Sequence, residues 1–265
     1  MTVTRQNSRA QGAAGLGPPP AQGLYDPRNE HDACGVGFVA DLKGRASHKI
    51  VEDGLKILVN LTHRGAAGAD PLAGDGAGIL VQIPHDFLHV TCKSVGITLP
   101  PPGQYAVGHM FMPRNAAQRI YCESVVQRAV EAEGLKLLGW RDVPTDNSCL
   151  SASVIETEPV HRQVFIGHGP DVADDAAFER KLYILRKVIS NTINGETGGH
   201  DIGYYTVSLS CRTLVYKGMF LAYQLGDYYP DLHHPRFTSA LALVHQRFST
   251  NTFPSWKLAH PYRMV

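Results

Sequence analysis

The segment Cys34-Gly-Val-Gly-Phe-Val-Ala40 marks the point where this 265-residue chain begins to look folded. The residues before it are rich in Gln, Asn, Ser, Ala and Gly and contain a Pro-Pro-Pro run at 18–20, a composition typical of a disordered leader. After Cys34 the apolar run is typical of a strand, and it ends at the turn-prone Asp41-Leu-Lys-Gly44. We therefore expect a leader over residues 1–33 and a folded region over residues 34–265.

The composition indicates an ordinary soluble core and excludes several classes of protein. Hydrophobic residues make up 43% and charged residues 18%, and 25 basic against 24 acidic side chains give a formal net charge of +1. This balance offers no basic surface for nucleic acid. We find neither the roughly 20 apolar residues of a membrane span nor a secretory signal. The five cysteines are widely spaced and form no C-x-x-C, so we expect a cytoplasmic protein without a disulfide framework or a structural zinc site.

Periodicity predicts one domain that mixes strands with two or three helices. The first helix follows a possible cap at Ser47 and ends near Gly65, and further helices are expected over residues 115–133 and 174–193. Strands are expected over residues 79–83, 105–112, 135–140, 205–209, 213–216 and 241–248. Strands at both ends of the chain, with no internal repeat, favour an α+β fold with layered sheets and helices.

Two glycine-rich segments resemble nucleotide-binding loops only superficially. Gly35-Val-Gly-Phe-Val-Ala40 fits the spacing G-x-G-x-x-A, but polar residues precede it and a strand follows it, the reverse of a dinucleotide fingerprint. Gly74-Asp-Gly-Ala-Gly78 lacks the Gly-Lys-Ser/Thr ending of a phosphate-binding loop. Glycines at this density indicate close backbone approach in a buried loop.

Cys34 is the cysteine that we single out as a candidate nucleophile. The other four, Cys92, Cys122, Cys149 and Cys211, are expected to be inert buried residues. If the leader is removed at the Ala33–Cys34 bond, the thiol shares a residue with a free α-amine of pKa about 7.7–8.0. That amine can take the thiol proton directly or through a water, so one residue would supply both nucleophile and base.

Two arginine-containing motifs supply candidate substrate-binding groups. His63-Arg64-Gly65 and His245-Gln-Arg247 each place a guanidinium where it could hold a substrate carboxylate with two hydrogen bonds. The alternative, which composition alone favours, is that both arginines satisfy backbone carbonyls at the end of a helix and of a strand. His233-His234 precedes Pro235 in an expected loop, and we predict no metal there.

Several long motifs resemble the N-terminal glutaminase domain of the glutamate synthase large subunit, in the same order from about residue 24 to Val265. These motifs are Cys34-Gly-Val-Gly-Phe38, His63-Arg-Gly-Ala-Ala-Gly-Ala-Asp70, Gly74-Asp-Gly-Ala-Gly-Ile79, Ser208-Leu-Ser210, Arg212-Thr-Leu-Val-Tyr-Lys-Gly218, Tyr229-Pro-Asp-Leu232 and Ala242-Leu-Val-His-Gln-Arg-Phe-Ser-Thr-Asn-Thr-Phe-Pro-Ser-Trp256. The resemblance implies a class II glutamine amidotransferase of the N-terminal nucleophile (Ntn) hydrolase type, an αββα sandwich.

The resemblance also implies roles for particular residues. The leader would be removed, and the thiolate of Cys34 would attack the side-chain amide of L-glutamine and release ammonia. Arg247 would hold the α-carboxylate of glutamine, and backbone groups near Thr250 and Asn251 would line the same pocket. Arg64 and Asp75 would act as supporting residues near the nucleophile. No metal and no cofactor is implied for this segment.

The sequence departs from the family pattern at two places. Gln246 stands where the family commonly has Ser. The stretch Pro261-Tyr-Arg-Met-Val265 continues in the family into an Asn-Gly-Glu segment that supplies the oxyanion hole, so we expect a domain that is incomplete at the C-terminus. The full-length enzyme would add synthase domains with FMN and an iron–sulfur cluster, a tunnel that carries ammonia to 2-oxoglutarate, and a small reductase subunit.

Two alternatives stay open at this point. One is a catalytically inactive fragment that lacks the oxyanion hole, because the loss of one oxyanion donor typically lowers the rate about 100- to 1,000-fold. The other is an ordinary cysteine hydrolase in which His31 or His63 acts as the base for Cys34. Activity with the leader still attached would favour this second alternative.

Overall fold

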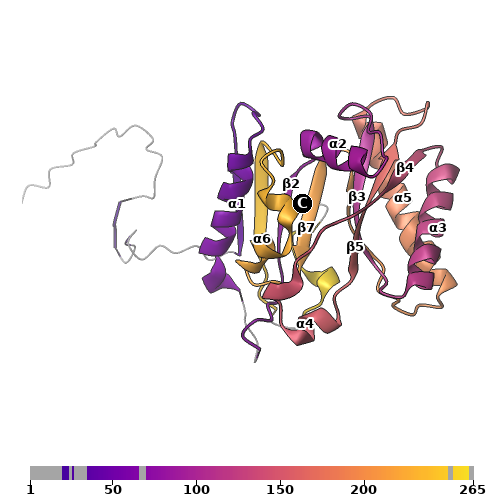
Figure 1. Cartoon of the computed structure of the whole chain (residues 1–265). Helices are drawn as coiled ribbons and strands as arrows, with labels where there is room; N and C mark the ends of the chain where they lie inside the picture. Colours follow the sequence, from indigo (N-terminus) through magenta and orange to yellow (C-terminus); the bar gives the residue numbers. More distant parts are fainter. Residues whose placement is uncertain (1–19, 24–25, 27–34, 66–69, 250–252, 263–265) are drawn as a thin grey trace, which may run out of the picture. The chain divides into compact units, whose positions relative to one another are not determined.

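The computed structural model describes residues 20–23, 26, 35–65, 70–249 and 253–262 (Figure 1). The chain divides into two units, residues 1–33 and residues 34–265, and the helices and strands named below belong to the second unit. Four residues that the sequence singled out, His31, Cys34, Thr250 and Asn251, lie outside the described residues.

The first sheet joins the two ends of the folded unit. Its strands, in spatial order, are β1 (Val36–Ala40), β8 (Leu241–Gln246), β2 (Ala77–Gln82) and β7 (Thr213–Gly218), and each neighbouring pair is antiparallel. Helix α1 (His48–Asn60) packs on β1 and β8 (Figure 1). The register of β1 against β8 places Val36 opposite His245, so the beginning of the folded unit meets the motif around Arg247.

The second sheet contains β4 (Lys136–Asp142), β5 (Val160–Gly167), β3 (Tyr105–Met112) and β6 (Tyr205–Ser210) in that spatial order, again all antiparallel. Helices α3 (Ala116–Ala132) and α5 (Asp175–Glu196) cover its outer face (Figure 1). The layers therefore run from α1 through the two sheets to α3 and α5. This arrangement confirms the predicted α+β class and the αββα sandwich.

The remaining elements are short, and most of them were not predicted. They are α2 (His85–Ser94), α4 (Ala152–Glu156), α6 (Gln224–Tyr228) and four 3₁₀ turns at Thr62–Arg64, Asn147–Cys149, Pro230–His233 and Trp256–Leu258. The prediction of two or three helices was too low for the described residues, and strand β5 was missed. Gly65 does not end α1, because the helix stops at Asn60 and a 3₁₀ turn follows.

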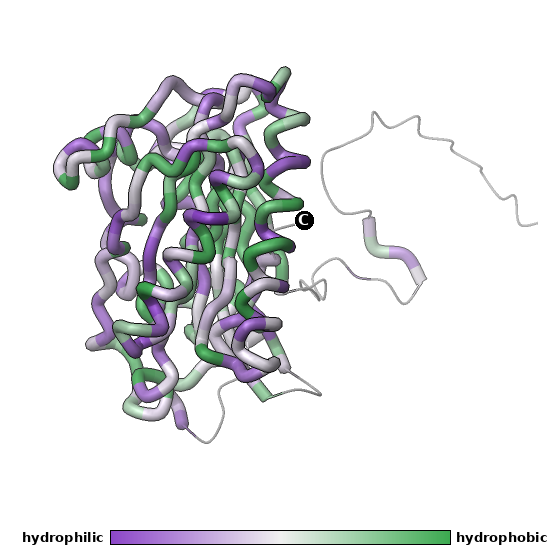
Figure 2. The backbone as a smooth tube through the Cα atoms, turned by 90° about the vertical axis from the view of Figure 1, so that its right-hand side faces the viewer, coloured by the Kyte–Doolittle hydropathy of each residue, from purple (hydrophilic) through white to green (hydrophobic). Residues whose placement is uncertain are grey.

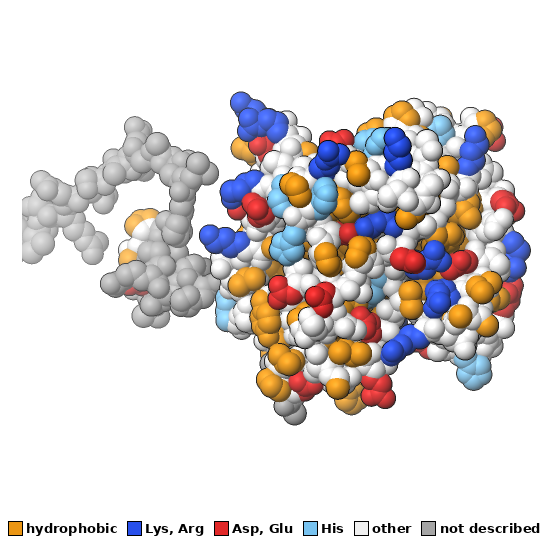
Figure 3. Space-filling view, in the orientation of Figure 1, with side chains coloured by type: hydrophobic (Ala, Val, Ile, Leu, Met, Phe, Trp, Pro, Cys, Tyr) orange, Lys and Arg blue, Asp and Glu red, His pale blue; other side chains and the backbone are white. Residues whose placement is uncertain are grey.

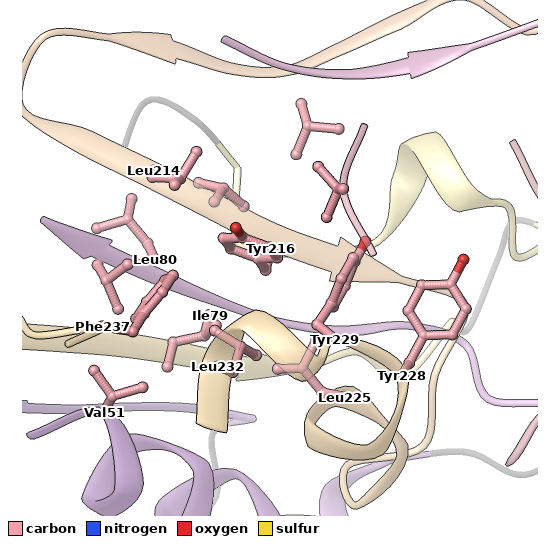
Figure 4. Close-up of a cluster of buried hydrophobic side chains, with 14 of the residues drawn as sticks. Val51, Ile79, Leu80, Leu214, Tyr216, Leu225, Tyr228, Tyr229, Leu232 and Phe237 are labelled. Carbon is pink, nitrogen blue, oxygen red and sulfur yellow. The ribbon is translucent and has the colours of Figure 1, made fainter. Parts of the chain in front are cut away.

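Two hydrophobic clusters hold the layers together. One lies around the first sheet and between the sheets, where Tyr216, Tyr229 and Phe237 pack with aliphatic residues from α1 and β2 (Figure 4). The other lies between the second sheet and helices α3 and α5. Figure 2 shows hydrophobic residues gathered along the central strands, while outer segments alternate between hydrophobic and hydrophilic. Apolar burial of this kind stabilises a fold by about 25 cal/mol per Å².

Three of the four cysteines that we expected to be inert are fully buried. Burial raises the thiol pKa of Cys92, Cys122 and Cys211 to about 12, so their reactive thiolate forms are rare at neutral pH. Cys149 is half-buried, and burial also raises its pKa.

On the face drawn in Figure 3, basic and acidic side chains are interspersed, in line with the balanced composition. Within the described ranges, no helix combines the length and the apolar character that crossing a bilayer demands.

Candidate active site

The beginning of β1 is fastened to the end of β8 by a close backbone contact at Gly35. The backbone N–H of Gln246 donates to the carbonyl oxygen of Gly35 at 2.7 Å. A Cβ on Gly35 would lie 2.2 Å from the carbonyl oxygen of Gln246, so a larger residue cannot replace this glycine without moving the strand. The residue that follows Cys34 is therefore held beside the His245-Gln-Arg247 motif.

Arg247 connects the end of β8 to the glycine-rich loop before β2. Its side chain is only 8% exposed, and its two terminal nitrogens donate to the carbonyl oxygen of Asp75 and to Oγ of Ser249, each at 3.3 Å. The Asp75 carboxylate in turn accepts a hydrogen bond from the backbone N–H of Ser249 at 2.5 Å. The guanidinium and the carboxylate thus belong to one hydrogen-bonded cluster, although 172 positions separate them in the chain.

Gly76 lets the glycine-rich loop pass close to this cluster. Its φ of +133° is unfavourable for residues with a side chain, and a Cβ would lie 2.8 Å from the Cβ of Ala259. Its carbonyl oxygen accepts from the backbone N–H of Arg247 at 2.8 Å. The prediction that these glycines mark close backbone approach in a buried loop is confirmed.

Arg64 lies near the end of β8 because the next residue, Gly65, packs against the side chain of Gln246. It ends the 3₁₀ turn Thr62–Arg64, and the following Gly65 lies directly against the side chain of Gln246, whose Nε2 would be 2.4 Å from a Cβ at position 65. Gln246 is 2% exposed, and neither its Nε2 nor its Oε1 has a hydrogen-bond partner within the described part of the chain. A buried amide without partners is energetically unfavourable, because its hydrogen bonds to water are lost and not replaced.

Three basic side chains next to the cluster were not among the predicted site residues. They are His245 on β8, Lys217 on β7 and His260. Gly78 on β2 lies between His245 and Lys217 in the register of the sheet. The His260 ring packs edge-on against that of His245, with their nearest ring nitrogens 3.2 Å apart. Lys217 is fully buried, and its ammonium donates to the carbonyl oxygens of Lys257 and Ala259.

Arg247 and Lys217 give the end of β8 a positive character, and this affects the two neighbouring histidines. Burial lowers the pKa of His245, and the nearby charge of Arg247 lowers it further. Burial and then the neighbouring His245, Arg247 and Lys217 lower the pKa of His260 to about 4, so both rings are neutral at pH 7. In the sequence, Lys217 is a single charge that follows the apolar residues Leu214-Val-Tyr216, and this pattern could have singled it out. The contact of His260 with His245 depends on the folded chain and leaves no such signal.

A cavity of about 560 Å³ lies elsewhere, between α4, the start of α3 and the segment around Trp256. Its lining includes neither Arg247 nor Asp75 nor Arg64, and we therefore place the candidate site on the hydrogen-bonded cluster rather than on this cavity. The part of the chain with described coordinates also contains no group of three or more His, Cys, Asp and Glu side chains arranged to hold a metal.

The structure thus brings Arg247 and Asp75 into direct contact. Arg64 lies nearby, because the adjacent Gly65 packs against Gln246, the residue before Arg247. A family model for class II glutamine amidotransferases matches residues 34–265. The chain belongs to this family.

Similar proteins carry the name glutamate synthase. The glutamate synthase (NADPH) large chain of Bacillus subtilis is 48% identical over 247 residues, which cover 93% of this chain and 16% of that protein. The glutamate synthase (NADH) of Schizosaccharomyces pombe is 43% identical over 252 residues, 93% of this chain and 12% of that protein. The chloroplastic ferredoxin-dependent glutamate synthase 2 of Arabidopsis thaliana is 41% identical over 243 residues, 91% of this chain and 15% of that protein. The chain therefore spans about a sixth of these relatives or less.

Proposed function

We propose that this chain is the glutamine-hydrolysing part of a glutamate synthase, with Cys34 as the nucleophile. The observation that carries the proposal is the meeting of Gly35, Asp75 and Arg247 at one end of β8. Cys34 directly precedes Gly35 in the chain, and this supports Cys34 as the residue that acts at this cluster. The family match begins at Cys34, which also supports a mature chain that starts there.

In the proposed reaction, removal of residues 1–33 exposes the α-amine of Cys34, which takes the thiol proton. The thiolate forms a bond to the side-chain carbonyl carbon of L-glutamine. The amide nitrogen then leaves as ammonia with the proton returned by the α-amine, and a thioester remains. Water attacks the thioester, frees glutamate and restores the thiol. A thiolate paired with an adjacent base is an activated nucleophile of a common kind.

The described side chains support substrate binding in this scheme. The Arg247 guanidinium carries the positive charge that the α-carboxylate of glutamine requires, and its buried position strengthens a charge-assisted hydrogen bond. Asp75 orders the turn at Ser249 that precedes Thr250 and Asn251, the residues we propose to line the same pocket. Arg64 would support the site from the 3₁₀ turn behind Gln246.

The ammonia would serve glutamate synthesis from 2-oxoglutarate in a longer enzyme located in the cytoplasm. FMN and an iron–sulfur cluster would belong to the synthase part of that enzyme, together with a small reductase subunit as a partner. None of the steps above uses either group.

The test is covalent labelling by a chloroketone analogue of L-glutamine, from which the Cys34 thiolate displaces chloride to form a thioether. We compare a chain that starts at Cys34 with one that retains residues 1–33, and we locate the adduct by peptide mass spectrometry. We expect labelling of Cys34 in the first chain only, with protection by L-glutamine. Cys34→Ser should abolish the adduct, whereas Cys149→Ser, which removes a half-buried thiol, should leave it unchanged.

Equal labelling with the leader attached would contradict the amine as base and favour a histidine base instead. Ammonia release is measured in the same samples. Labelling without ammonia release would identify a chain that binds glutamine and does not hydrolyse it.

A further inference from the structure

A second cavity, of about 590 Å³, lies between α5 and the turn that joins β6 to β7. Its volume falls within the range of about 300–1,000 Å³ that is usual for small-molecule sites. Its lining contains Arg180, Tyr183, Ile184 and Arg186 from α5, with Leu209 and Arg212 from the hairpin. None of these residues belongs to the amidotransferase cluster, so a role for this cavity is independent of the proposed glutaminase reaction.

The wall of the cavity is fixed by hydrogen bonds between the helix and the hairpin. Oε1 of Glu179 accepts from Oγ of Ser210 and from the backbone N–H of Cys211, each at 2.7 Å. Oγ of Ser210 also accepts from the backbone N–H groups of Arg212 and Thr213, at 2.9 and 3.1 Å. The turn is thereby held against α5, and the cavity does not depend on a loose loop for its shape.

The charges around the cavity are strongly unbalanced. Arg180, Arg186 and Arg212 face a single lining carboxylate, Glu179, which already accepts two hydrogen bonds. Arg186 is 9% exposed, and its guanidinium carbon lies 5.1 Å from the centre of the Tyr183 ring. Arg180 and Arg212 are exposed, and the ion pairs found among the described residues include neither of them.

The apolar part of the lining indicates what the charges would bind. Tyr183 and Ile184 remain 45% and 47% exposed on α5, and Leu209 lies beside them in the wall. A bare inorganic ion would leave this surface in water, and a cation would be repelled by the exposed guanidinium groups of Arg180 and Arg212. Guanidinium groups match the geometry of carboxylates and phosphates, which they bind through paired hydrogen bonds.

We propose that this cavity is a binding site for a small organic anion, with a carboxylate or phosphate held by Arg180 and Arg212 and an apolar body against Tyr183, Ile184 and Leu209. Arg186, whose guanidinium stacks on the Tyr183 ring, completes the helix side of the lining. The site is distinct from the place proposed for glutamine at Arg247.

Isothermal titration calorimetry, which measures the affinity of the whole chain for each of three matched probes, tests this proposal. Benzoate and phenyl phosphate carry the two anionic groups on an aromatic ring, and benzamide is their neutral counterpart. We expect the tighter-binding anion to exceed benzamide in affinity by about tenfold or more at low salt, equivalent to about 1.4 kcal/mol. Its affinity should fall as the salt concentration rises. The stronger of the two anions identifies the ligand as a carboxylate or a phosphate.

Two exposed arginines and a matched lysine provide the variants. Arg180→Gln and Arg212→Gln should each weaken binding of the preferred anion severalfold, with the thermal unfolding midpoint unchanged. Lys187→Gln removes an exposed positive charge from the same helix outside the cavity and should leave binding unchanged. Benzamide binding as tightly as both anions, no binding by any probe, or an equal effect of Lys187→Gln would each overturn the proposal.

Discussion

Arg247 is the residue whose structural surroundings bear most directly on the proposed chemistry. Its guanidinium is buried and donates to the carbonyl oxygen of Asp75 and to Oγ of Ser249, which fixes its position at the end of β8. A hydrogen bond to a charged group contributes about 1.5–3 kcal/mol. We expect Arg247→Gln to raise the glutamine concentration that protects Cys34 from the chloroketone by about ten- to a hundredfold.

The control for this substitution is Arg128→Gln, which removes an exposed arginine on α3. Thermal unfolding of both variants separates a loss of binding from a loss of fold. Unchanged protection in a folded Arg247→Gln protein would show that another residue holds the α-carboxylate.

Gln246 and Gln163 form a natural pair for testing what a buried amide contributes. Both are buried, but the side-chain amide of Gln246 has no hydrogen-bond partner among the described residues, whereas that of Gln163 accepts from Arg141 and donates to the Tyr216 hydroxyl. We expect Gln246→Met to leave the free energy of unfolding unchanged or to raise it by about 1 kcal/mol, because no partner is lost.

Gln163→Met should instead lower the free energy of unfolding by about 2–3 kcal/mol, since it removes two buried hydrogen bonds, one from Arg141 and one to the Tyr216 hydroxyl. Urea unfolding of the two variants provides the measurement. A larger loss for Gln246→Met than for Gln163→Met would mean that the Gln246 amide is bonded in solution.

Strands β3 and β5 show which elements a sequence pattern can predict and which it misses. Strand β3 was predicted over residues 105–112 with its observed bounds, because its eight residues are buried and mostly apolar. Its neighbour Val160–Gly167 was missed because His161, Arg162 and Gln163 interrupt the apolar run. His161 and Gln163 are nevertheless buried, since His109, Tyr216 and Tyr228 from distant elements supply their hydrogen bonds. Periodicity cannot reveal such partners.

The 3₁₀ turn Pro230–His233 depends on a similar long-range contact. Asp231 accepts two hydrogen bonds from Arg141 on β4, at 2.7 and 2.8 Å, and one from the Tyr216 hydroxyl on β7. Both members of the ion pair are almost fully buried. We expect Asp231→Asn to lower the free energy of unfolding by about 3–5 kcal/mol, because it leaves the Arg141 charge buried without its counter-ion.

The matched control is the exposed ion pair of Arg45 with Asp41. Asp41→Asn should lower the free energy of unfolding far less than Asp231→Asn does, as is usual for a surface pair. Chemical unfolding of the two variants at pH 7 tests the difference. Equal effects would show that the Asp231 contact does not tie its turn to the two sheets.

At the scale of the whole molecule, the sequence predicted the layers better than it predicted the site. The resemblance to glutaminase domains pointed to Arg247, Asp75 and Arg64, and the structure brings the first two into contact. Lys217 and His260 were missed because their burial depends on the segment around Lys257–Ala259 crossing the first sheet. Motifs thus marked two residues, Arg247 and Asp75, that the fold brings into contact, and they missed Lys217, whose burial depends on tertiary packing.

Buried neutral histidines link the sheets and should make the stability of the whole molecule sensitive to acid. Burial lowers the pKa of His109 to about 4 and that of His161 well below its usual value. His109 lies between the sheets, where its Nδ1 donates to the carbonyl oxygen of Val215 at 2.8 Å in the neutral tautomer that fits this contact. An unfolded histidine has a pKa of about 6.5, so below that pH the unfolded chain binds protons that the folded chain does not.

The free energy of unfolding should therefore be highest above pH 6.5 and fall as the pH drops towards 4. A shift from 6.5 to about 4, at 1.36 kcal/mol per unit, makes the contribution of His109 alone about 3 kcal/mol. Urea midpoints measured between pH 4 and pH 7.5 check this, with His109→Gln expected to have a shallower pH dependence and His200→Gln, an exposed position, an unchanged one. If His109→Gln retained the full acid sensitivity of the parent chain, the buried histidines would not be its cause, and protonation of carboxylates would have to account for it.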